Sequence, residues 1–100
     1  MSEAERDEGE VVAVAWYRPS QWERLEAIAP DIKEIWQSYE QWRTSATRRM
    51  SQLQRNGQQA RKVEVDVEAL AEWCRQHQRP VDVAARAEYA AAQLAEILGH

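Results

Sequence analysis

Cys74 and His77 are the two side chains best suited to chemistry in this chain of 100 residues. They lie three residues apart, a spacing that places both on the same side of a helix. A thiolate and an imidazole could ligate zinc there, but a zinc site needs about four ligands. The chain has no other cysteine, and its other histidine is His100. Glu72 and Asp82 would therefore have to complete such a site.

The same pair could instead supply a nucleophile and its general base. That chemistry needs an activated thiol and a third group that orients the imidazole, and no nucleophile motif surrounds Cys74. The structural alternative is a buried cysteine that packs as a small apolar side chain, with His77 near a helix C-terminus, where its positive charge is favoured. We expect this alternative, and so we assign no catalytic residue and no metal ligand.

The rest of the sequence lacks the motifs of the common enzyme classes. The three glycines are isolated at positions 9, 57 and 99, so there is no glycine-rich phosphate loop. Neither H-E-x-x-H nor G-x-S-x-G occurs. No carboxylate has an apolar sequence environment that would tune its pKa for acid–base catalysis. We therefore predict that the protein is not an enzyme and binds no cofactor.

Residues 41–62, hereafter the basic segment, contain no acidic residue, although the whole chain has a net charge of -4. Serine, threonine and glutamine lie among the arginines of this segment. Such side chains contact phosphates in nucleic-acid complexes. The candidate contacts to a partner or to phosphates are Arg43, Arg48, Arg49, Arg55, Arg61 and Lys62. Two features argue against a nucleic-acid partner: the chain is acidic overall, and it has no helix-turn-helix signature. An acidic protein, or an acidic part of another copy, is the other partner that this charge fits.

Three further segments predict the elements that precede the basic segment. Residues 11–17 form a short apolar run rich in β-branched residues, which predicts a strand with both faces covered. Ser20 and Glu23 have the spacing of a capping box, which predicts the start of a helix. Pro30 would end that helix, because proline lacks the N–H that a helix interior needs.

Residues 31–56 predict one long amphipathic helix that Asp31 caps, with Glu34 three residues later, and that ends before Gly57. Its apolar positions recur at steps of three and four: Ile32, Ile35, Trp36, Tyr39, Trp42, Ala46, Met50 and Leu53. At about 1.5 Å per residue this helix would be about 38 Å long. We expect its first half to lie in the core and its basic second half to project or to pack against another copy.

Alternating polar and apolar residues at 62–67 predict a second strand. Asp66 would then cap a helix that ends near His77, and Asp82 would cap a last helix that ends at Gly99. The predicted fold class is therefore α+β, mainly helical, with the order β-α-α-β-α-α and two short strands. A two-stranded sheet is marginal unless it is covered or extended, and an exposed edge invites pairing. We therefore expect a homodimer, formed through a strand or the long helix.

Composition also indicates how the chain is divided into domains and in which cellular compartment it resides. Residues 1–10 are acidic and predict a disordered tail, followed by a single domain over residues 11–100. No apolar run approaches the roughly 20 residues of a membrane span, and the N-terminus lacks the pattern of a signal peptide. A single cysteine allows no intrachain disulfide, as in a reducing compartment. We therefore expect a cytoplasmic protein without a membrane partner.

Three segments are rich in tryptophan, tyrosine and alanine: Val14-Ala15-Trp16-Tyr17-Arg18 with Trp22, then Leu70-Ala71-Glu72-Trp73-Cys74, then Arg86-Ala87-Glu88-Tyr89. In these segments the chain resembles a family of short bacterial proteins that has no assigned activity. The likeness covers about residues 11–95 and implies a bacterial cytoplasmic origin, but it carries over no site residue. From the sequence we expect a small, non-catalytic interaction or accessory protein that self-associates. The alternative is a nucleic-acid-associated protein that uses the basic segment.

Overall fold

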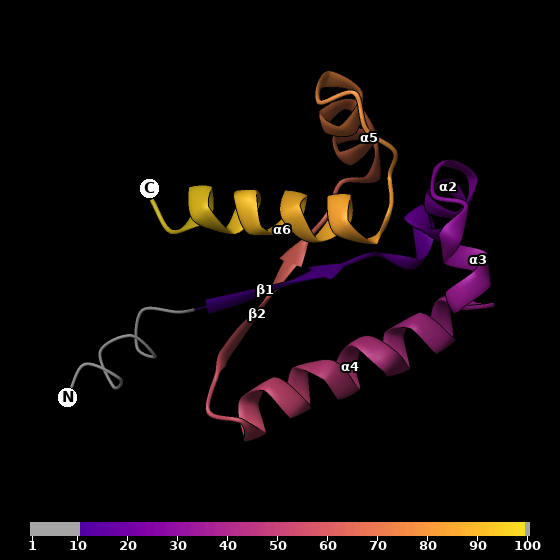
Figure 1. Ribbon diagram of the computed structural model, residues 1–100. Helices are drawn as coiled ribbons and strands as arrows, with labels where there is room; N and C mark the ends of the chain where they lie inside the picture. Colours follow the sequence, from indigo (N-terminus) through magenta and orange to yellow (C-terminus); the bar gives the residue numbers. More distant parts are fainter. Residues whose placement is uncertain (1–10, 100) are drawn as a thin grey trace.

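The computed structural model describes residues 11–99, and the acidic tail predicted for residues 1–10 lies outside them. Two strands and five helices follow one another along the described chain (Figure 1). They are β1 (Val11–Trp16), α2 (Pro19–Ile28), α3 (Asp31–Ile35), α4 (Tyr39–Arg55), β2 (Gln59–Glu64), α5 (Val67–Gln76) and α6 (Val83–Ile97). This arrangement confirms the mainly helical α+β fold, with one helix more than the sequence predicted.

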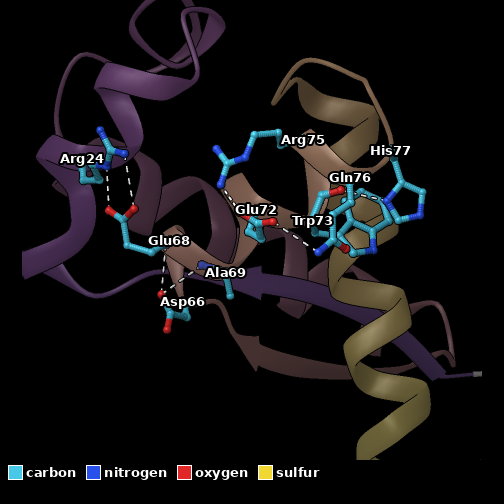
Figure 2. Close-up of polar contacts among 9 residues, drawn as sticks. All are labelled: Arg24, Asp66, Glu68, Ala69, Glu72, Trp73, Arg75, Gln76 and His77. Carbon is cyan, nitrogen blue, oxygen red and sulfur yellow. Dashed lines mark hydrogen bonds and ion pairs between the residues drawn. The ribbon is translucent and has the colours of Figure 1, made fainter.

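The two strands form a parallel sheet in which Val11 lies opposite Gln59 and Trp16 lies opposite Glu64. Parallel strands need a crossover connection, and α2, α3 and α4 supply it. β2 begins three residues earlier than the predicted strand at 62–67. It also ends earlier, because the Asp66 side chain accepts hydrogen bonds from the first backbone N–H groups of α5 (Figure 2).

Helices cover both faces of the strand pair, as the apolar pattern of β1 predicted. Figure 1 shows α6 above the strands and α4 below them. On one face Val63 packs with Ala90 and Leu94 of α6. On the other, the Trp16 ring lies 5.1 Å from the ring of Trp42 in α4, measured between ring centroids. The strand pair is thus the middle layer between two helices.

The predicted long amphipathic helix exists as α4, but it starts eight residues later than expected. Trp36 has an extended backbone (φ -131°, ψ 133°), which separates α4 from α3. Ser38 Oγ accepts a hydrogen bond from the N–H of Gln41 at 3.1 Å, and Gln41 Oε1 accepts one from the N–H of Gln37 at 2.9 Å. These reciprocal bonds resemble a capping box and favour a new helix start. α4 is therefore about 26 Å long rather than about 38 Å.

Of the four predicted N-terminal caps, those at Asp66 and Asp82 are confirmed, and the Asp82 side chain accepts a hydrogen bond from the N–H of Ala85 at 2.9 Å. The other two predictions are wrong. α2 begins at Pro19, one residue before Ser20, because proline suits the first helical position. Its N-cap residue makes no side-chain hydrogen bond. Asp31 does not cap α3, because its carboxylate is engaged by Arg86 of α6.

Five aromatic side chains form one cluster where β1, α2 and α4 meet. The ring centroids of contacting pairs lie 5.1–6.4 Å apart, in tilted or edge-to-face arrangements. The members of this aromatic cluster are Trp16, Tyr17, Trp22, Tyr39 and Trp42. It holds α4 against the sheet and so fixes which side of α4 faces solvent.

Candidate interaction surfaces

One edge of β1 is open. Within residues 11–99, β1 pairs with β2 alone. The carbonyl oxygen of Trp16 accepts a hydrogen bond from the N–H of Val65 at 3.0 Å, so the backbone groups of Trp16 point toward β2. Because these directions alternate along a strand, the N–H and C=O groups of Ala13 and Ala15 point away from β2. They are therefore directed toward the open edge.

The two strands differ in how their side chains protect an edge. β2 exposes Arg61, Lys62 and Glu64, whereas β1 contains neither a charged residue nor a proline. Charged side chains and prolines are the usual means by which proteins prevent an edge strand from pairing with another chain. β1 lacks this protection, and its open edge is therefore competent to pair.

A groove of about 380 Å³ lies along the open edge, between α4 and α6. Its floor is formed by residues 13–15 of β1, and we call it the β1 groove. Trp36, together with Ser45 and Arg49 of α4, lines one wall, and Val83 and Ala87 of α6 line the other. Val83 is 55% exposed although it is apolar. The groove thus combines free backbone groups with an accessible apolar wall.

The side of α6 that borders the β1 groove is apolar beyond the groove itself. Val83, Ala87 and Ala91 are spaced four residues apart, which places them on one side of the helix. Leu98, seven residues after Ala91, extends this apolar side, and all four residues are exposed. Exposed apolar side chains gathered on one side of a helix are typical of an interaction site.

A buried ion pair fixes the α6 wall. Arg86 Nη1 and Nη2 donate to the two carboxylate oxygens of Asp31 at 2.9 and 3.1 Å, and Nη1 also donates to the carbonyl oxygen of Val81 at 3.1 Å. The side chains of Arg86 and Asp31 are 7% and 27% exposed. A bidentate pair of this geometry is both strong and directional. It joins α6 to α3 and orients the start of α6 beside the groove.

Tyr17, next to this pair, should make stability depend on pH. Burial raises the pKa of its phenol from 10 to about 12, although the nearby Arg86 charge opposes the shift. Below about pH 10 the phenol is protonated in both folded and unfolded chains, so its contribution to stability is constant. Between about pH 10 and 12 only the unfolded chain loses the proton. We expect the free energy of unfolding to fall there by about 2–3 kcal/mol.

Tyr17→Phe provides the test, because phenylalanine cannot titrate. Urea unfolding from pH 8 to pH 12 should show a smaller alkaline loss of stability for this variant than for the wild type. Parallel curves for the two proteins would contradict the assignment to Tyr17.

The structure gathers three of the six predicted basic contact residues on one surface. Arg43, Arg48 and Arg55 line an open depression on the outer side of α4, and we call these three residues the α4 arginine surface. Arg49 instead lines the β1 groove. The other two, Arg61 and Lys62, are neighbours in β2 and so point to opposite faces. The Lys62 ammonium lies 4.2 Å from the centroid of the Trp16 ring.

Arginines within residues 11–99 divide into two groups. The first group makes ion pairs with carboxylates: Arg18 with Glu64, Arg24 with Glu68, Arg75 with Glu72, Arg79 with Glu88 and Arg86 with Asp31. Figure 2 shows the second and third of these pairs. The second group makes no ion pair with a described residue and is exposed: Arg43, Arg48, Arg49, Arg55 and Arg61. The second group is confined to the basic segment.

Cys74 and His77 do not form a reactive pair. Cys74 is 2% exposed, and burial raises the pKa of its thiol, whereas a nucleophilic cysteine needs a lowered pKa. His77 is exposed; its Nδ1 lies 2.8 Å from the carbonyl oxygen of Trp73, and its ring centroid lies 4.3 Å from that of Trp73 (Figure 2). Among residues 11–99, no three His, Cys, Asp or Glu side chains are placed to hold a metal ion.

Comparison with protein-family models, curated proteins and solved structures found no match. The resemblance to short bacterial proteins therefore stays a prediction, and a functional proposal has to rest on the two surfaces described above. None of the helices within residues 11–99 has both the length and the apolar character needed to cross a membrane.

Proposed function

We propose that this protein is a non-catalytic interaction protein that self-associates through the open edge of β1. The observation that carries the proposal is an unprotected strand edge beside an exposed apolar wall. A two-stranded sheet gains stability when further strands extend it. Free backbone groups of Ala13 and Ala15 also gain hydrogen-bond partners when another strand is added.

A second copy of the chain is the partner that fits this edge. Two β1 strands related by a two-fold axis run antiparallel. The backbone N–H and C=O groups of Ala13 and Ala15 in one copy can therefore form hydrogen bonds with the C=O and N–H groups of the same residues in the other copy. The resulting sheet has four strands, with β2 at both outer edges, where Arg61, Lys62 and Glu64 prevent further addition. The same symmetry turns the apolar sides of the two α6 helices toward each other across the axis.

Ala15→Pro is expected to convert the dimer to a monomer. It removes an N–H that points to the open edge, while the hydrogen bonds to β2 come from the alternate residues of β1. Sedimentation velocity over micromolar concentrations measures the change, and circular dichroism checks that the helices persist. Ala87→Glu should have the same effect without altering the strand, because it places a charge on the exposed wall of the groove.

Ala92→Glu is the matched control, because Ala92 is also an exposed alanine of α6 but does not line the β1 groove and, five residues from Ala87, lies on a different side of the helix. This variant should sediment like the wild type. A wild-type protein that stays monomeric throughout would refute self-association. A dimer that survives both Ala15→Pro and Ala87→Glu would show that another surface is responsible.

A further inference from the structure

We infer that the α4 arginine surface binds the phosphate backbone of double-stranded nucleic acid without sequence preference. The inference is independent of self-association, because Arg43, Arg48 and Arg55 lie on the outer side of α4 and do not line the β1 groove. Ion pairs are unevenly distributed among the arginines of the described residues.

These three arginines lack carboxylate partners in a chain that has acidic residues to spare. Asp and Glu together number 17, against 13 Lys and Arg, yet the basic segment contains none of the acids. One carboxylate, that of Glu40, lines the depression. It lies in the first turn of α4, where the helix dipole already favours a negative charge. The guanidinium groups are therefore available to an external anion.

The surface is extended rather than concentrated at one point. From Arg43 to Arg55 the helix rises about 18 Å at about 1.5 Å per residue. Thr44, Thr47 and Ser51 lie between the arginines in the same depression. A duplex carries one phosphate charge per roughly 1.7 Å of its axis, so a row of this length spans several phosphates. Arginine and hydroxyl side chains are typical phosphate contacts.

The composition of the depression favours a duplex over a single strand. Its lining residues are Glu40, Arg43, Thr44, Thr47, Arg48, Ser51 and Arg55, with no aromatic side chain among them. Proteins that bind single strands stack the bases on aromatic side chains. On the opposite side of α4, Trp42 and Ala46 are buried against the rest of the fold. The depression itself therefore offers polar side chains to a backbone and no aromatic ring on which a base could stack. The neighbouring Trp36, which shares a shallow hollow with Thr44 and Arg48, is half-buried.

Fluorescence anisotropy with the full chain and a labelled DNA duplex of about 20 base pairs tests the inference. We expect binding at about 20 mM salt and a linear fall of log K with log salt. The triple variant Arg43→Gln/Arg48→Gln/Arg55→Gln should bind at least about tenfold more weakly. The slope should become shallower by about one unit for each arginine removed. An RNA duplex of the same length should bind similarly, because the contacts are to phosphates.

The matched control is Arg18→Gln/Arg24→Gln/Arg75→Gln, which changes the net charge equally but removes exposed arginines that are already ion-paired. Its affinity should stay within about twofold of the wild type. Absence of binding at low salt would overturn the inference. So would an equal loss of affinity in the control, equal binding of a single strand, or equally tight binding of polyglutamate, which would indicate an acidic protein as the partner. None of these outcomes bears on self-association, which sedimentation measures separately.

Discussion

Asp31→Ala should lower the free energy of unfolding by about 3 kcal/mol, as measured by urea denaturation. The variant leaves the Arg86 guanidinium, 7% exposed, without the carboxylate that accepts two of its hydrogen bonds. An uncompensated charge in the core is costly because it has lost its water and gained no partner. A domain of this size is typically stable by about 5–15 kcal/mol, so the loss would be a large part of the total.

The double variant Asp31→Ala/Arg86→Met separates the cost of the orphaned charge from the value of the pair. Methionine fills a similar volume and carries no charge, so the double variant should recover most of the stability that Asp31→Ala loses. If the double variant is less stable than the wild type, the pair itself contributes net stability relative to its apolar replacement. A loss below about 1 kcal/mol in Asp31→Ala would contradict the burial of Arg86, since that is the range of exposed pairs.

Trp42→Ala should cost about 3–5 kcal/mol, because it removes the central ring of the aromatic cluster and leaves a cavity. Trp42 is 4% exposed, and its ring centroid lies within 6 Å of those of Trp16, Tyr17, Trp22 and Tyr39. No other side chain joins α4 to so many neighbours of the cluster. Denaturant unfolding followed by circular dichroism gives the stability, and a protein that no longer folds would be the extreme form of the same result.

Trp73→Ala is the comparison for this experiment. Trp73 is half-buried and lies outside the aromatic cluster, against Tyr89 and His77. Its replacement removes the same atoms from a less enclosed position and should cost clearly less. Equal losses in the two variants would mean that the aromatic cluster has no special role in holding α4.

Local signals made much of the fold predictable. The β-branched run at β1, the caps at Asp66 and Asp82 and the stop at Gly57, which has a positive φ of 82°, all depend on neighbouring residues. The break before α4 was also encoded locally, in the reciprocal bonds of Ser38 and Gln41. It was missed because the apolar spacing continues through the break.

Features that depend on distant residues could not be predicted. Nothing in the sequence marks Asp31 and Arg86 as partners across 55 positions, so a cap was the natural assignment for Asp31. The β1 groove requires the parallel pairing and the placement of α4 and α6, neither of which local sequence patterns predict. The contrast between an uncharged β1 and a charged β2 was visible, however, and it is the signal that could have indicated the open edge.

The basic segment combines one feature that the sequence predicts with one that depends on the fold. A run of basic residues without acids is a local property of the sequence, and all six predicted contact residues in it are exposed. Their division among the outer side of α4, the β1 groove and the two faces of β2 depends on where Trp42 and Trp16 meet in the core. Sequence spacing alone treated the six residues as one cluster.

The parallel pairing of β1 and β2 also has a consequence for synthesis. Val11 pairs with Gln59, which lies 48 positions later, so a growing chain emerges from the ribosome with β1 complete and its partner missing. At about 5–20 residues per second, β1 waits about 2–10 s for β2. During that interval both edges of an uncharged, β-branched strand are accessible. Neighbouring nascent chains on one messenger would present the same strand at the same time, so pairing between copies could begin before either chain is complete.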